Sequence, residues 1–142
     1  MTDRYAEYRA LAKALGVDAV ALVPGPNFAR LMRHEFHTNE RPLVVVIPVD
    51  GPPAAVVPNL ELGSWAALGF EGETFDWRDQ TGHDAAFAAL AAHLPLRSVA
   101  VEGQVMRVFV HHALSNAYGT LDIRDHEAGI GALRVVKTPE EL

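Results

Sequence analysis

The segment 43–47, Leu-Val-Val-Val-Ile, constrains the fold of this chain more than any other part of the sequence. An unbroken run of apolar, mostly β-branched residues is typical of a strand buried on both faces of a sheet. A second apolar run at 54–57 follows a polar turn that contains Asp50 and Gly51. So short a connection predicts an antiparallel hairpin.

Helix-like and strand-like segments alternate along the rest of the chain. Residues 2–15 are amphipathic, with Thr2 or Asp3 as the expected N-cap and Gly16 as the stop signal. Asn27 is expected to cap a short second helix. Further helices are predicted at 60–68, 84–94, 106–117 and 125–136, and further strands at 17–23, 74–77, 98–101 and 120–122. This alternation predicts an α/β fold with a mixed β-sheet flanked by helices, in one domain that spans residues 1–142.

Composition excludes several classes of protein. The net charge is −6, and the 12 Lys and Arg residues are scattered, which argues against nucleic acid as a partner. There is no cysteine, so disulfides and thiolate metal sites are excluded. No apolar stretch approaches the roughly 20 residues of a membrane span. We therefore expect a soluble, cytoplasmic protein without a membrane partner.

Histidines and carboxylates are the residues most able to carry chemistry. His34 and His37 with Glu35 between them are one residue short of the His-Glu-x-x-His pattern that places two imidazoles on one helical face. We therefore expect no metal ligand among the histidines.

Three carboxylates, Asp76, Glu102 and Asp122, fall at or near predicted strand ends, where α/β sheets bind ligands. Together they could hold two divalent cations, as a nuclease requires, although the acidic net charge argues against that function. No serine has the setting of a hydrolase nucleophile, and the glycines do not form a phosphate loop. The sequence thus predicts no catalytic residue in this chain.

The last residues resemble the beginning of another helix. Thr138 is a suitable N-cap, Pro139 suits the first helical position, and acidic residues follow in the first turn. A cap without the rest of its helix predicts that the domain is truncated before further protein.

Several segments resemble the amino-terminal domain of the creatinase, prolidase and aminopeptidase P family, the Xaa-Pro peptidases with a pita-bread catalytic domain. Residues 26–31 resemble the family's Asn-x-x-Tyr-Leu-Thr-Gly segment, and residues 50–61 are similar to its hairpin and following helix. Residues 99–102, Val-Ala-Val-Glu, also resemble the family's sequence. Residues 133–142 resemble its Leu-Arg-x-x-Lys-x-Pro-x-Glu junction with the catalytic domain.

The resemblance implies a mixed sheet of ribonuclease H-like topology and chemistry that lies in a carboxy-terminal domain. There, two divalent metal ions, commonly manganese, cobalt or zinc, activate water, while the fragment itself holds no cofactor. The implied partners of this domain are its own catalytic domain, a second subunit in a homodimer and a proline-containing peptide. The family's amino-terminal domain contributes subunit contacts and substrate gating. The implied active-site rim comprises Asn27, Arg30, His34 and His37.

This chain departs from the family pattern near the rim. Arg30 stands where Tyr is usual, Met32 where Thr is usual and Arg33 where Gly is usual. Two alternatives therefore stay open: a freestanding ligand-binding or adaptor module, and the amino-terminal domain of a creatinase-like amidinohydrolase.

Overall fold

The hairpin predicted between residues 43 and 57 lies inside a six-stranded mixed sheet. The computed structural model describes residues 3–38 and 41–135. Its strands are β1 (Ala19–Leu22), β2 (Val44–Pro48), β3 (Ala54–Pro58), β4 (Glu73–Trp77), β5 (Ser98–Val101) and β6 (Asp122–Asp125). Their order is β4-β3-β2-β1-β5-β6; β2 runs antiparallel to both of its neighbours, and all other pairs are parallel. The predicted mixed α/β sheet is confirmed.

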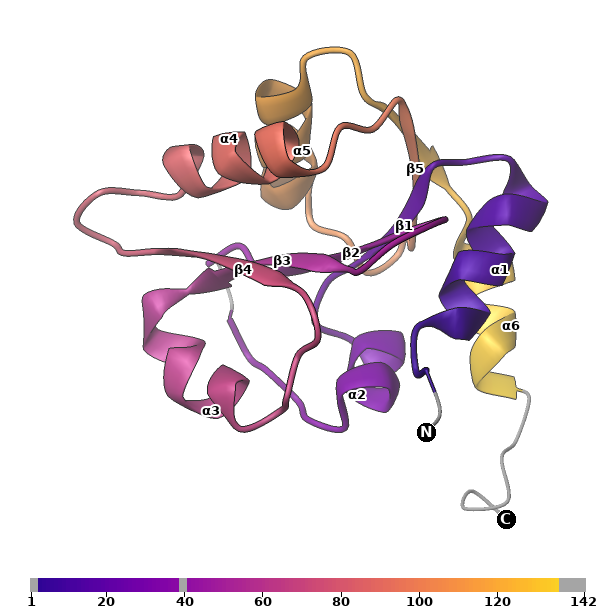
Figure 1. Ribbon diagram of the computed structural model, residues 1–142, viewed down its shortest axis with the longest axis horizontal. Helices are drawn as coiled ribbons and strands as arrows, with labels where there is room; N and C mark the ends of the chain where they lie inside the picture. The colour runs from indigo at the N-terminus through magenta and orange to yellow at the C-terminus, as the bar shows by residue number, and fades with distance from the viewer. Residues whose placement is uncertain (1–2, 39–40, 136–142) are drawn as a thin grey trace.

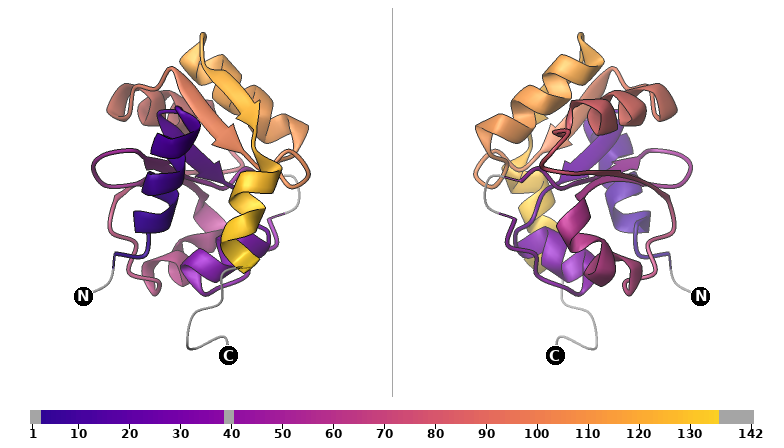
Figure 2. Two further views of the ribbon diagram at one scale, coloured as in Figure 1. Left: turned by 90° about the vertical axis from the view of Figure 1, so that its right-hand side faces the viewer. Right: turned by 90° about the vertical axis from the view of Figure 1, so that its left-hand side faces the viewer.

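Helices cover both faces of the sheet. They are α1 (Ala6–Leu15), α2 (Pro26–Met32), α3 (Leu62–Ala66) after a short 3₁₀ turn (Asn59–Glu61), α4 (Asp84–His93), α5 (Val108–Tyr118) and α6 (Glu127–Val135). Figure 1 shows the sheet nearly edge-on, with α4 and α5 above it and α2 and α3 below it. Helices α1 and α6 pack side by side, as Figure 2 shows.

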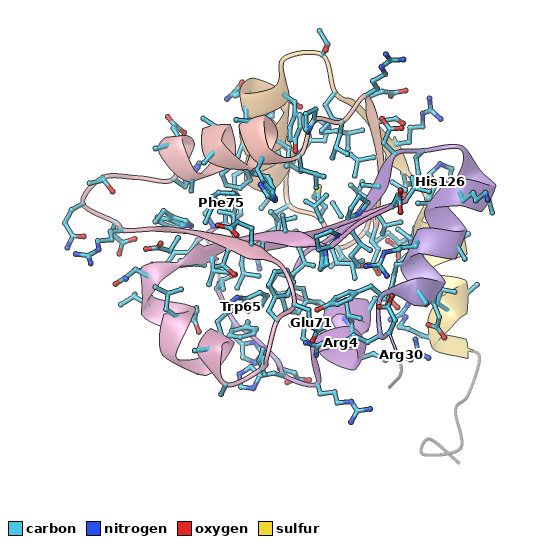
Figure 3. The ribbon with its side chains drawn as sticks, viewed as in Figure 1. Arg4, Arg30, Trp65, Glu71, Phe75 and His126 are labelled. Atoms are coloured by element: carbon cyan, nitrogen blue, oxygen red, sulfur yellow. The ribbon has the colours of Figure 1, made fainter. Side chains whose placement is uncertain are left out.

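Side chains that alternate between the two faces of the strands form two separate hydrophobic cores. In β1, Val20 and Leu22 face the core under α1, α2 and α6, whereas Ala21 faces the core under α4 and α5. Both sets are buried because side chains of a strand alternate between its two faces. Figure 3 shows the same division at the aromatic residues, with Trp65 on one side of the sheet and Phe75 on the other.

Helix α1 ends where the sequence predicts but does not begin there. Gly16 adopts the left-handed conformation (φ 72°) that ends many helices, as predicted. The N-cap is Tyr5, and no side chain caps the helix, so the prediction of Asp3 as N-cap is wrong. The Asp3 carboxylate instead accepts a hydrogen bond from the Tyr5 N–H at 2.9 Å, in the turn before the helix. The alternative cap Thr2 lies outside the described residues. The predicted helix start at Thr138 and Pro139 also lies outside them.

The elements near the end of the sheet differ from the prediction by a few residues. Helix α5 begins at Val108 rather than at 106, because the Val105 and Met106 N–H groups both bind the Glu102 carbonyl in a turn. The last strand occupies Asp122–Asp125 rather than 120–122. No helix within the described part of the chain is long and apolar enough to cross a membrane.

Candidate functional site

The chain passes from β1 to α2 through a tight turn at Pro24, Gly25 and Pro26. Pro26 occupies the first turn of the helix, where its missing N–H costs no hydrogen bond. A Cβ atom at Gly25 would lie only 2.7 Å from the Val105 Cγ1. Glycine therefore allows this turn to approach the loop between β5 and α5.

Asn27 does not cap α2, so that prediction is wrong. The N-cap is Gly25, and the Asn27 side chain is fully buried. Its Nδ2 donates to the Glu102 Oε2 at 2.9 Å and to the Ile130 carbonyl at 3.2 Å. Its Oδ1 accepts a hydrogen bond from the Tyr8 hydroxyl at 3.2 Å. The side chain points inward because its partners lie in α1, in α6 and directly after β5, all remote from it in the sequence.

Arg30 faces α1 rather than the histidines. Its Nη1 lies 3.2 Å from the Glu7 Oε2, and its guanidinium also reaches the Tyr8 hydroxyl. Burial raises the pKa of Tyr8 to about 12, so its hydroxyl keeps its proton and can donate to Asn27. Figure 3 shows Arg30 at the side of the molecule near α1 and α6.

Arg33 ends α2 in the left-handed conformation, with φ 57°. This region of backbone space suits glycine and penalises a side chain that carries Cβ. The positive φ at position 33 is consistent with the glycine that is usual there in the family pattern described above. Arg33 holds this strained conformation at the start of the exposed segment that follows.

Residues 33–38, which we call the rim segment, are held by one aromatic anchor. The Phe36 ring is buried and lies 5.9 Å from that of Phe28 and 6.0 Å from that of Trp65, between ring centres. His34 is exposed, and the centre of its ring lies 4.5 Å from that of Phe36, with the two rings tilted by 57°. The side chains of His37 and Glu35 are 83% and 76% exposed, with 3.8 Å between the His37 Nε2 and the Glu35 Oε2. The segment thus presents two imidazoles and a carboxylate to solvent.

Two hollows flank the rim segment. One of about 310 Å³ lies between the 24–26 turn and the side chains of His34 and His37. The other, of about 150 Å³, is lined by His37, Thr38, Arg41, Arg107 and Phe109. Arg41 also pairs with Asp79, its Nη2 lying 2.8 Å from the Asp79 Oδ2. Imidazole and guanidinium groups around small hollows can bind carboxylate or carbonyl groups of a ligand.

The four rim residues predicted from the resemblance therefore separate into three places. His34 and His37 lie together beside the larger hollow, Asn27 lies buried beneath the start of α2, and Arg30 faces α1. Sequence reasoning missed Phe36 as the anchor. The signal was its position as the one large apolar residue between polar neighbours in residues 33–38.

The carboxylates considered for metal binding do not converge. Asp76 lies in β4 and Asp122 in β6, which are opposite edges of the sheet, and Glu102 follows β5. Over residues 3–38 and 41–135, no three His, Asp or Glu side chains form a group that could hold a metal ion. The described residues thus do not fit a dinuclear metal centre or the nuclease alternative.

Comparison with known proteins identifies the family. The family described as the Creatinase/Prolidase N-terminal domain matches residues 4–136. No curated protein sequence matches the chain significantly.

Among solved structures, the fold resembles a proline dipeptidase from Streptococcus pneumoniae, at 18% identity and a TM-score of 0.82, over 96% of this chain and 100% of that one. It also resembles a prolidase from Thermococcus sibiricus, at 22% identity and a TM-score of 0.83, over 99% of this chain and 39% of that one. The dipeptidase PepE from Mycobacterium ulcerans is 27% identical, with a TM-score of 0.78, over 97% of this chain and 37% of that one.

The chain thus spans less than two fifths of the prolidase and of PepE. The family match, in contrast, extends over nearly all of this chain, from the start of α1 to the end of α6. The chain belongs to the creatinase/prolidase N-terminal domain family.

Proposed function

We propose that this chain is the amino-terminal domain of a prolidase-like hydrolase and that its rim segment borders the entrance to the active site. The observation that carries the proposal is the exposed pair His34 and His37 beside a hollow of about 310 Å³, on a segment anchored by Phe36. An anchored segment with exposed polar tips can select ligands without moving. The relatives are named proline dipeptidase, prolidase and dipeptidase, which indicates the substrate class.

In this proposal the chemistry belongs to a carboxy-terminal domain that follows residue 142. The family's two divalent metal ions would be bound in that domain, since the described residues of this chain offer no group of side chains that could hold them. This domain would contribute subunit contacts in a homodimer and a wall that limits substrate length.

An exposed imidazole pair suits the proposed entrance. An imidazole ring can both accept and donate hydrogen bonds. At the mouth of a site it can bind the carboxylate of a short peptide and leave a longer peptide without that contact. The rim would thereby favour dipeptides by recognition of their free carboxyl end.

The test compares this chain with the longer protein that contains it and a following carboxy-terminal domain. Both are incubated with Xaa-Pro dipeptides, with and without Mn²⁺. We expect hydrolysis by the longer protein and none by residues 1–142 alone. Hydrolysis by the short chain would contradict the proposal, and a stop codon directly after residue 142 would favour a freestanding binding module. Hydrolysis of creatine in place of peptides would favour the amidinohydrolase alternative.

A further inference from the structure

A buried polar cluster ties α6 to the rest of the domain. Asn27, Tyr8 and Glu102 are 0%, 1% and 2% exposed. Through the two donors of its amide, Asn27 joins the carboxylate of Glu102, at the end of β5, to the Ile130 carbonyl in the middle of α6. The position of α6 thus depends on the Asn27 amide, whose other donor is held by the Glu102 carboxyl group.

One oxygen of that carboxyl group lacks a partner. Within the described residues, the buried Glu102 Oε1 forms no hydrogen bond. A buried carboxylate with an unpaired oxygen is costly, whereas the neutral acid carries less charge into the interior. The position therefore favours the protonated form.

The charged and titratable groups around Glu102 do not remove this cost. Tyr8 and Glu7 face the cluster from α1, and Arg30 faces it from α2. From α6, Glu127 and Arg134 act on the carboxyl in opposite directions. His126 lies at the start of α6, and its N–H binds the Val101 carbonyl next to Glu102. Desolvation is the largest effect, and burial raises the pKa of Glu102 above its ordinary value.

We propose that Glu102 is a proton-dependent latch for α6: the neutral carboxyl group holds the helix against α2 and β5, and its ionisation loosens that seat. This inference concerns the domain itself and does not rest on the proposed hydrolase function. Helix α6 follows the edge strand β6, so the latch acts on the helix that carries the chain away from the sheet.

The direction of the pH effect follows from the raised pKa. When α6 opens, Glu102 meets water and regains an ordinary pKa, so the opened state ionises first as pH rises. Opening becomes more favourable between the two pKa values and then stays constant above the folded-state value. Exchange protection of the α6 amides is thus expected to fall about tenfold for each unit between the two pKa values.

The experiment is amide hydrogen exchange by NMR on the whole chain, expressed as protection factors between about pH 4 and pH 9, together with titration of the Glu102 carboxyl carbon. The α6 amides, among them that of Ile130, report the latch, and the amides of α4 serve as an internal reference. We expect α6 protection to fall with rising pH while α4 protection stays constant.

Three variants separate Glu102 from its neighbours. Glu102→Gln keeps an oxygen acceptor for Asn27 and cannot ionise, so α6 protection should no longer depend on pH. Glu127→Gln removes a facing carboxylate, and His126→Gln removes the imidazole at the start of α6; both should keep the pH dependence. A wild-type Glu102 that titrates near the ordinary value of about 4.3 would overturn the proposal. So would a pH dependence that persists in Glu102→Gln or disappears in His126→Gln.

Discussion

The two ends of α2 differ sharply. At its start, Asn27 is buried and uses its amide donors and its oxygen on three different elements. At its end, residues 33–38 are anchored by the Phe36 ring, and the side chains of His34, Glu35 and His37 face solvent. The contrast indicates that the first end fixes the helix, whereas the second exposes the side chains that we propose to meet a ligand.

The largest expected effect comes from removing the amide at the buried end. Asn27→Leu keeps the approximate size of the side chain but removes the bonds to the Tyr8 hydroxyl, the Ile130 carbonyl and the Glu102 Oε2, and it leaves the Glu102 carboxyl group unpaired. Each lost bond costs about 1 kcal/mol and the unpaired buried group roughly 1–3 kcal/mol more, so the free energy of unfolding should fall by about 4 kcal/mol in denaturant titration. A loss below about 1 kcal/mol would show that the cluster does not fix α2.

Removing the anchor at the other end should cost somewhat less. Phe36→Ala deletes a ring that contacts Phe28, Trp65 and His34, and the free energy of unfolding should fall by about 3 kcal/mol. The matched control Phe36→Leu retains most of the apolar volume and should lose less than half as much. A loss below about 1 kcal/mol in Phe36→Ala would show that the aromatic ring is not the anchor.

Sequence reasoning performed well where the structural signal is local. The apolar run 43–47 and the turn after it predicted β2 and β3, and Gly16 predicted the end of α1, because each pattern lies within a few consecutive residues. The last strand was predicted too early, at 120–122, because the Asp-Ile-Arg-Asp sequence of β6, at an edge of the sheet, contains only one apolar residue.

The candidate site depends on partners that are distant in the sequence. Asn27 fits the rule for an N-cap, but Glu102 lies 75 positions away and Ile130 lies 103 positions away. No local pattern reveals that these groups meet. The exposed His34 and His37 were found through the family resemblance, whereas Phe36 became recognisable as their anchor only from its ring contacts.

The protonation of Glu102 offers a smaller test of the buried end. Its raised pKa means that the unfolded chain ionises first as pH rises, so wild-type stability should decrease between the unfolded and folded pKa values. Glu102→Gln should lack that decrease, which amounts to about 1.4 kcal/mol for each pH unit between the two pKa values, in denaturant titrations at several pH values. A decrease of equal size in the variant would assign it to another group.

The smallest expected change in stability concerns the end of α2. Arg33→Gly relieves the left-handed backbone strain and should raise the free energy of unfolding by roughly 0.5–1 kcal/mol. Arg33→Ala keeps the strained conformation and should give no such gain. If the glycine variant is less stable than wild type, contacts of the Arg33 side chain outweigh its backbone strain.

Substrate selection by the rim segment is the central claim, and its test needs the longer protein with a carboxy-terminal domain. His34→Ala with His37→Ala should leave stability within about 0.5 kcal/mol of wild type, since both side chains are exposed. The control changes His111→Ala with His112→Ala alter two exposed histidines on α5, across the sheet.

The deciding measurement is the ratio of kcat/KM for an Xaa-Pro dipeptide to that for the same sequence lengthened at its carboxyl end. We predict that the His34 and His37 changes lower this ratio about tenfold, mainly through KM, and that the α5 control leaves it unchanged. An unchanged ratio in the His34 and His37 variant would contradict the account.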